Sequence, residues 1–234
     1  NIYKETFVEA FVYGDFLEKD AKSILDKFKE KTKTKGISRE SAFDIKYLSQ
    51  DKPEFLQYVD RLKVNNSCFY REYSLGEDTP VNRALSQVVS QAIQQPFYTE
   101  MRTNQQLGYI VWSYPRMRDN THYLAFLIQS GVYSASELSK RASKLIYDLP
   151  QTIQNLENET FEQLKQSAIE QLEKKPMSIA ERAGKLKNFV FEHDADFDRD
   201  NKTIKAIKSL QKDQAFNFLD KAVSNKTRKA VNFI

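Results

Sequence analysis

The order of the predicted elements in this sequence indicates an α+β fold, in which strands and helices form separate layers. Segments typical of strands dominate up to Ser130, and segments typical of helices follow from Ser134 to the end. Their alternation is too irregular for repeating βαβ units, which argues against a doubly wound parallel sheet. Only 6 Gly and 6 Pro are available to build a linker, so we expect residues 1–234 to form a single domain.

The first part of the chain is predicted to contain short strands and one helix. Thr6 to Tyr13 is rich in aromatic and β-branched residues and ends at Gly14-Asp15, which predicts a strand followed by a turn. Apolar residues at three- and four-residue spacing predict a helix from Glu18 to about Lys31. Three further segments rich in Tyr and Phe predict strands: Phe43 to Leu48, Phe55 to Leu62 and Ser67 to Leu75.

The second part begins with a well-marked helix and a hairpin. A continuous apolar stripe from Val81 to Ile93 predicts a helix that Pro96 ends or kinks. Strands from Leu107 to Tyr114 and from His122 to Ser130, joined by a polar connection, are predicted to pair antiparallel. The remainder predicts helices at about 134–149, 159–173, 178–191 and 200–222 and a closing strand from Arg228 to Phe233. The residues predicted to be buried lie on the apolar stripes of the helices: Ile24, Leu25, Leu85, Val89, Leu145, Leu164 and Leu186.

The composition argues against several classes of protein. Hydrophobic residues make up 40% of the chain and charged residues 29%, which suits a packed core and argues against disorder. The net charge is only +4, and the basic run from Lys27 to Lys35 continues a helix end without a groove of aromatic residues, so we expect no nucleic-acid partner. No run of 18 apolar residues predicts a membrane span. The single cysteine, Cys68, lies in a strand-like segment, where we expect it to be buried. The chain begins at Asn1 rather than at a methionine, so we expect it to be a fragment of a longer multi-domain chain.

Groups that could catalyse a reaction or bind a metal are scarce. The chain has two histidines, His122 and His193. An inverted zinc motif needs two histidines and a glutamate on one helical turn, and Phe189 occupies the first position of the motif that His193 would end. The acidic run that contains Asp198 and Asp200 lacks the glycine and the glutamate of a calcium loop, so we expect one of these two aspartates to cap the last helix. We therefore predict no catalytic residue, no metal ligand and no cofactor in this chain.

The most specific motif follows the predicted helix. It reads Met101-Arg102-Thr103-Asn104-Gln105-Gln106-Leu107-Gly108-Tyr109, and it is preceded by Gln95-Pro96-Phe97-Tyr98. The Arg-Thr-x-x-Gln-Leu-Gly-Tyr string resembles the C-terminal domain of the pitrilysin/insulinase family of zinc metallopeptidases, and weaker matches extend over essentially the whole chain. The resemblance implies a mainly antiparallel sheet covered on one face by helices, in the LuxS/metallohydrolase-like class, with the other face lining a chamber for the substrate.

The resemblance also implies a substrate-binding role for Arg102 and Tyr109. In this family the arginine and the tyrosine of the string reach the substrate backbone beside the scissile bond, and both side chains are able to donate to a carbonyl. Without the resemblance, an arginine at a helix end and a tyrosine at a strand start are ordinary surface residues. Zinc and its H-x-x-E-H motif are expected in the N-terminal catalytic half of the same chain. That half and peptide substrates are the expected partners, and a dimer is compatible with the sequence.

Two functions from different classes follow from these observations. The first is an inactive, zinc-less C-terminal domain of a zinc metalloendopeptidase, which encloses and positions peptide substrates and hydrolyses nothing by itself. The alternative is a non-proteolytic scaffold or assembly subunit of the same fold, in which an arginine that binds carbonyls has no physical purpose. A bacterial, pitrilysin-like protein is expected in the periplasm, and a protein of another source in the cytoplasm.

Overall fold

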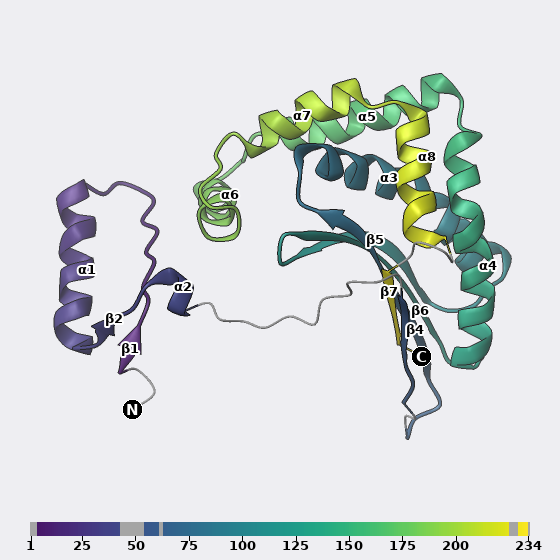
Figure 1. The fold of residues 1–234 in the computed structure, drawn as a ribbon, viewed down its shortest axis with the longest axis horizontal. Helices are drawn as coiled ribbons and strands as arrows, with labels where there is room; N and C mark the ends of the chain where they lie inside the picture. Colours follow the sequence, from purple (N-terminus) through teal and green to yellow (C-terminus); the bar gives the residue numbers. More distant parts are fainter. Residues whose placement is uncertain (1–3, 43–53, 61–62, 225–228, 234) are drawn as a thin grey trace. The chain divides into compact units, whose positions relative to one another are not determined.

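The computed structural model describes all residues except 1–3, 43–53, 61–62, 225–228 and 234 (Figure 1). The chain divides into two compact units, one formed by residues 1–49 and 175–197 and the other by residues 50–174 and 198–234. Because each unit has its own set of contacts, the two are described separately, and the prediction that residues 1–234 form one domain stays a prediction. The strand predicted at Phe43 to Leu48 lies outside the described residues.

The larger unit is built on a five-stranded sheet with the strand order β3-β7-β4-β6-β5. The strands are β3 (Glu54–Tyr58), β4 (Ser67–Glu77), β5 (Ile110–Arg118), β6 (Thr121–Ser130) and β7 (Lys229–Phe233). β4 pairs antiparallel with β6 and β7, β5 pairs antiparallel with β6, and β3 pairs parallel with β7. The predicted hairpin of β5 and β6 is confirmed. It turns at Asp119 and Asn120, whose φ angles of 48° and 58° are the left-handed values that these residue types adopt with little strain.

Helices of the larger unit cover one face of the sheet (Figure 1). α3 (Pro80–Tyr98), α4 (Ala135–Gln154) and α8 (Lys212–Val223) lie against the sheet, and the π-helix η1 (Thr99–Asn104) continues α3. α5 (Asn158–Glu173) and α7 (Arg199–Ser209) pack on α3. Alternate strand residues such as Phe69, Tyr73 and Phe126 are fully buried against the helices, together with Val88 and Ile93 of α3. The predicted α+β fold, with a mainly antiparallel sheet covered by helices, is therefore confirmed. Among the described helices, none has the length and apolar character to cross a membrane.

The described residues of the smaller unit form a two-stranded parallel sheet and three helices. These elements are β1 (Glu5–Thr6), α1 (Glu18–Thr32), β2 (Lys35–Gly36), α2 (Arg39–Ala42) and α6 (Ile179–Glu192). The prediction of a strand up to Tyr13 is wrong beyond Thr6, because β1 ends there and, of the predicted segment, only Thr6 pairs with β2. Val8 and Val12, which follow, are exposed. β-branched composition alone does not make a strand when no neighbouring strand lies alongside the segment.

Predicted burial is confirmed for the α3 residues, only partly met at Leu145 and Leu164, and wrong for α1. Leu85 and Val89 are buried, and Leu145 and Leu164 pack against the core as half-buried side chains. Leu186 of α6 is also half-buried. In α1 no residue is buried: Ile24 is 54% exposed, which makes its assignment to the core wrong, and Leu25 is only half-buried. Helical spacing identifies the apolar side of a helix but does not show that another element covers it.

Two helix boundaries differ from the prediction. α3 continues through Pro96, although the proline ring removes one backbone donor, because Phe97 and Met101 on the following turns are fully buried and hold the helix in place. The helix predicted over residues 200–222 is broken at Leu210, which has extended backbone angles. The buried Lys165 ammonium donates to the Leu210 carbonyl at 3.1 Å, so the interruption supplies an acceptor for a buried charge.

Candidate substrate-contact site

Arg102 lies on the π-helical turn that connects α3 to β5. The Gln105 amide donates to the Glu100 carbonyl, five residues earlier, at 2.9 Å. The Glu100 carboxylate accepts hydrogen bonds from the side chains of Asn104 and Gln105, both at 2.8 Å, and these bonds lower the pKa of Glu100. Met101 is fully buried and anchors the turn, whereas Arg102 is half-buried. A π-helical turn re-aims side chains relative to an α-helix, and such turns are frequent at functional sites.

A tight connection places Tyr109 immediately before β5. The Leu107 amide donates to the Met101 carbonyl at 2.9 Å, and the Leu107 side chain is fully buried. Gly108 passes so close to β6 that a Cβ atom there would lie 1.9 Å from the carbonyl oxygen of Gln129. Only glycine fits this approach without moving the backbone. Tyr109 follows directly and is 85% exposed.

The structure brings the two predicted substrate-binding residues into contact. The Cζ atom of Arg102 lies 5.4 Å from the centroid of the Tyr109 ring. This is cation–π geometry, worth about 0.5–1 kcal/mol at an exposed site. Within the described part of the chain, no hydrogen bond or ion pair engages the Arg102 guanidinium or the Tyr109 hydroxyl, so the contact orients both groups while their donors remain available to another molecule.

The uncovered face of the sheet carries a second group of polar side chains. Because Phe69 and Tyr73 of β4 point into the core, Tyr70 and Glu72 point to the opposite face. Glu72 is only 4% exposed, since Arg116 and Arg118 of β5 donate to its carboxylate at 3.0 and 3.4 Å. We call Tyr70, Glu72, Arg116 and Arg118 the open-face cluster.

Tyr70 completes the hydrogen bonding of the open-face cluster. Its hydroxyl donates to Glu72 and accepts from Arg116 at 3.2 Å. Burial and the hydrogen bond to Glu72 raise the pKa of Tyr70, which therefore stays protonated at neutral pH. The register places Ala125 of β6 between Glu72 and β5, and this small side chain leaves space for Arg116 to reach across. The two arginines are roughly half-exposed, so the cluster presents guanidinium donors with an excess of one positive charge.

The sequence reasoning missed the open-face cluster. The sequence did contain a signal. Tyr70 and Glu72 are two residues apart in one strand, and Arg116 and Arg118 are two residues apart in another, so each pair lies on one side of its strand. The interaction nevertheless depends on the register of β4 against β6 and of β6 against β5, which brings together residues more than 40 positions apart. A single sequence does not show that register.

The two histidines are engaged in separate structural contacts. His122 of β6 lies 2.8 Å from the carboxylate of Asp78, which also pairs with Arg83 and Arg199. Burial lowers the pKa of His122, although Asp78 opposes this effect. His193 follows α6 and lies 3.3 Å from the side chain of Asn188. Across the residues that the structure describes, no group of three or more His, Cys, Asp or Glu side chains is arranged to hold a metal ion.

Two further sequence predictions concern Cys68 and the acidic run. Cys68 is exposed, so the prediction of a buried cysteine is wrong. It shares the uncovered face of β4 with Tyr70 and Glu72, as strand alternation requires. Asp198 is the residue immediately before α7, as expected for a cap, but its carboxylate accepts from the Asn201 side chain at 2.8 Å instead of from a backbone amide.

Comparisons with known proteins agree with the fold and with the family resemblance of the sequence. Residues 88–187 match the profile of the family described as PQQ synthase PqqF-like, C-terminal lobe domain 4. Protease 3 of Salmonella typhi is 30% identical over 149 residues, which cover 64% of this chain and 16% of that protein. Human insulin-degrading enzyme is 27% identical over 220 residues, which cover 90% of this chain and 21% of that protein.

Solved structures with the same fold come from the same group of proteins. The crystal structure of pitrilysin aligns with a TM-score of 0.81 and 22% identity, over 94% of this chain and 23% of that one. The peptidase M16 inactive domain from Pseudomonas fluorescens aligns with a TM-score of 0.62 and 14% identity, over 94% of this chain and 51% of that one.

The fold is that of pitrilysin-type peptidase domains. The matched profile, the curated relatives and the fold together support a C-terminal domain of a pitrilysin/insulinase (M16) family peptidase. The chain spans about a fifth of the length of the curated relatives that it matches, or less.

Proposed function

We propose that this chain is the non-catalytic, substrate-holding domain of a zinc metalloendopeptidase, which encloses a peptide together with an N-terminal catalytic half. The observation that supports the proposal most is the contact between Arg102 and Tyr109, just before β5, which is one of the two edge strands of the described sheet. The proteins that this chain resembles are named as proteases or as inactive peptidase domains. A scaffold protein of the same fold has no need for two aligned donors at this position.

Arg102 and Tyr109 would hold the peptide by its backbone. A guanidinium donates to a carbonyl through a planar fork, and a phenol donates through a single hydroxyl. The ring beneath Arg102 reduces the number of positions that the guanidinium samples, so less conformational entropy is lost when the peptide binds. Holding one carbonyl fixes the adjacent scissile bond relative to the attacking water, which lowers the barrier of the chemical step.

The metal chemistry is assigned to the catalytic half. Zinc bound there by an H-x-x-E-H motif would supply Lewis-acid activation of water and of the scissile carbonyl. The described residues of this chain do not fit such a site, because His122 pairs with Asp78 and His193 lies beside Asn188, on separate elements. The contribution of this chain is therefore binding and orientation.

The open face of the sheet is suited to line the enclosure. The open-face cluster holds Arg116 and Arg118 in position on the buried carboxylate of Glu72, and Trp112 on the same face of β5 is 57% exposed. A wall with fixed donors and an exposed aromatic ring is able to contact both the backbone and the side chains of a peptide. Such contacts would restrain the peptide at positions away from the scissile bond.

The test uses the complete protein that carries this chain, with Arg102→Ala and Tyr109→Phe as separate variants. We expect kcat/KM on a peptide substrate to fall by about 10²-fold for Arg102→Ala, because one donor to the transition state is lost. Tyr109→Phe keeps the ring beneath Arg102 and removes only the hydroxyl, so a fall in kcat/KM identifies that hydroxyl as a donor to the substrate.

A matched control is available in the same unit. Arg141 lies over the ring of Tyr133 with its Cζ 4.9 Å from the centroid, and neither residue belongs to the motif. Arg141→Ala and Tyr133→Phe should leave kcat/KM within about twofold of the wild type, and zinc content should be unchanged in all four variants. Full activity of both Arg102→Ala and Tyr109→Phe would refute the proposed role.

A further inference from the structure

The smaller unit leaves most of its large apolar side chains uncovered. Among its described residues, Phe189 is the one apolar side chain that is buried, and every other buried apolar residue belongs to the larger unit. Its exposed large apolar side chains are Val8, Val12, Phe16, Leu17, Ile24, Phe28, Met177, Ile179 and Phe197. A unit folds stably only when it removes such surface from water. The described residues of the smaller unit therefore do not form a core of their own.

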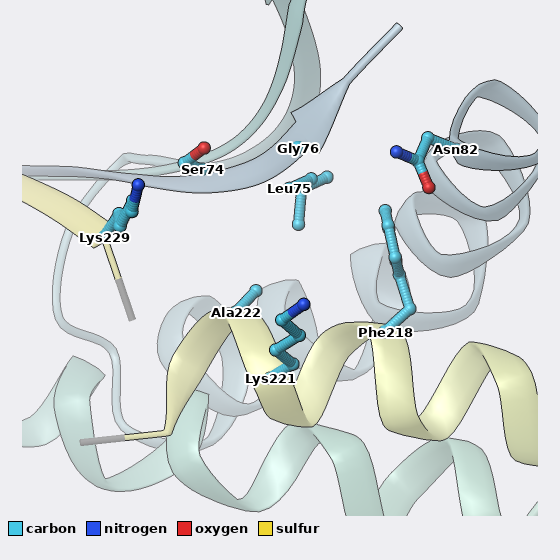
Figure 2. Close-up of a pocket in the computed structure, with 8 residues that line it drawn as sticks. All are labelled: Ser74, Leu75, Gly76, Asn82, Phe218, Lys221, Ala222 and Lys229. Carbon is cyan, nitrogen blue, oxygen red and sulfur yellow. The ribbon is translucent and has the colours of Figure 1, made fainter. Parts of the chain in front are cut away.

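The larger unit provides the contrast. Its elements cover one another, and even its pocket of 330 Å³ beside Gly76 is lined by residues of β4, α3, α8 and β7 of the same unit (Figure 2). In that view Phe218 rises from α8 and Leu75 points toward it from β4, so apolar groups of the two layers face each other. The uncovered surface is thus a property of the smaller unit alone.

Helix α1 carries a continuous apolar side. The apolar residues at three- and four-residue spacing are Leu17, Ala21, Ile24, Leu25 and Phe28. Leu17, Ile24 and Phe28 are 61%, 54% and 46% exposed, and no residue of α1 is buried. A helix of 15 residues gains most of its stability from packing of its apolar side. This side of α1 is therefore a surface to which another element docks.

The segment before α1 has the alternation of a strand. Over residues 7–13, half-buried and exposed positions alternate without exception. The rings of Phe11 and Tyr13 stack with their centroids 6.1 Å apart and 8° between their planes, as expected for residues two apart in an extended backbone. Val8 and Val12 lie on the opposite, exposed side. Among the residues that the structure describes, no strand pairs with this segment.

We propose that residues 7–32 complete a domain in the part of the complete protein that precedes this chain. Residues 7–13 would add a strand to the edge of a sheet in that part, and α1 would cover one face of the same sheet with its apolar side. A strand followed by an amphipathic helix is half of such a two-layer arrangement and needs a sheet to complete it.

The preceding part of the same protein is the occupant that the observations favour. The match to human insulin-degrading enzyme covers only 21% of that protein, so most of its length lies outside the match. Consecutive elements of a chain usually lie beside one another, and residues 7–32 stand next to whatever precedes them. The proposal takes from the proposed function only that a longer protein, with an N-terminal half, carries this chain.

The first measurement is hydrogen exchange of the complete wild-type protein without added peptide. We expect at least alternate amides of residues 8–13 to exchange about 100-fold more slowly than in an unstructured peptide, because an added edge strand bonds through alternate residues. Exchange at the unstructured rate would overturn the proposal. Slow exchange that is lost on dilution to a monomer, or that appears only after a peptide is added, would overturn it as well.

The second measurement identifies what covers α1. Photoreactive p-benzoylphenylalanine replaces Phe28 in one variant of the complete protein, and in the control it replaces Glu30, on the polar side of the same helix. We expect the variant at Phe28 to cross-link to residues that precede Asn1 in the same molecule, and the variant at Glu30 to give no such link. A mixture of isotope-labelled and unlabelled protein separates links within one molecule from links between copies.

Three results of the cross-linking would contradict the proposal. Links from position 28 to residues 50–174 or 198–234 would show that the larger unit covers α1, and links between copies would show a dimer interface. No link from position 28, or equal links from both positions, would show that the apolar side is uncovered. Hydrogen exchange decides the matter if a variant does not fold. Neither measurement uses hydrolysis, so this inference and the role of Arg102 and Tyr109 can fail separately.

Discussion

Replacing Gly108 with alanine tests how the structure positions Tyr109. The new Cβ would lie 1.9 Å from the Gln129 carbonyl oxygen and 2.8 Å from its carbon, whereas ordinary contacts begin at 3.4 Å. The oxygen and the Cβ atom must therefore move apart by a further 1.5 Å to go from 1.9 Å to 3.4 Å. Backbone atoms provide this displacement, since no flexible side chain is involved.

The displacement should appear in both stability and activity. It falls where Ile110 pairs with Gln129, so the start of β5 must move away from β6. Overpacking of this kind costs about 1–3 kcal/mol, and we place Gly108→Ala at the upper end because the clash is with backbone. Tyr109 moves with the strand, and a misplacement of about 1 Å near a reacting group can lower kcat/KM by about 10²-fold.

The assay is urea unfolding of the complete protein, followed by peptide hydrolysis at a temperature where the variant is folded. Gly131→Ala is the control, because a Cβ there would approach nothing closer than the Asn65 carbonyl oxygen at 3.9 Å. We expect Gly131→Ala to change the free energy of unfolding by less than about 1 kcal/mol. A Gly108→Ala variant with the stability and the kcat/KM of the wild type would refute this account of how Tyr109 is held.

Two further predictions concern buried carboxylates. Although burial opposes ionisation of Asp78, hydrogen bonds from Arg199, His122 and Arg83 lower its pKa from 3.8 to about 2. Because the pKa of Asp78 is lower in the folded state, its ionised form stabilises the protein at any pH above the unfolded-state pKa. This stabilisation, about 2.5 kcal/mol, is lost as the pH falls through the folded-state pKa, so it should disappear between about pH 4 and pH 2. The difference in unfolding free energy between wild type and Asp78→Asn should shrink over that interval, and a constant difference would contradict the assignment. Glu72→Gln should destabilise the protein by about 1–3 kcal/mol in urea unfolding, because Arg116 and Arg118 lose the carboxylate between them. Glu77→Gln, on the exposed end of the same strand, should change stability by less than about 0.5 kcal/mol, and equal effects of the two variants would show that the open-face cluster contributes little.

Local sequence patterns correctly predicted the elements that depend mainly on nearby residues, namely amphipathic helices with a covered apolar side and a hairpin with a tight turn. The stripe that contains Leu85 and Val89 became the buried side of α3, and the turn residues Asp119 and Asn120 lie at the tip of the β5–β6 hairpin. Pro96 was misleading because burial of Phe97 and Met101 outweighs the loss of one backbone hydrogen bond.

The candidate site was predictable only through resemblance. Arg102 and Tyr109 were identified from the motif, but their mutual contact depends on the π-helical turn and on the close approach of Gly108 to β6. Neither feature leaves a periodic pattern in the sequence. The open-face cluster likewise depends on strand register, which is a tertiary property.

A structure of the complete protein with an uncleaved peptide bound is the most direct test of the central claim. We predict that a guanidinium nitrogen of Arg102 or the hydroxyl of Tyr109 lies about 3 Å from a peptide carbonyl oxygen beside the scissile bond. The peptide should also lie against the uncovered face of the sheet. A bound peptide that contacts neither Arg102 nor Tyr109 would contradict the claim.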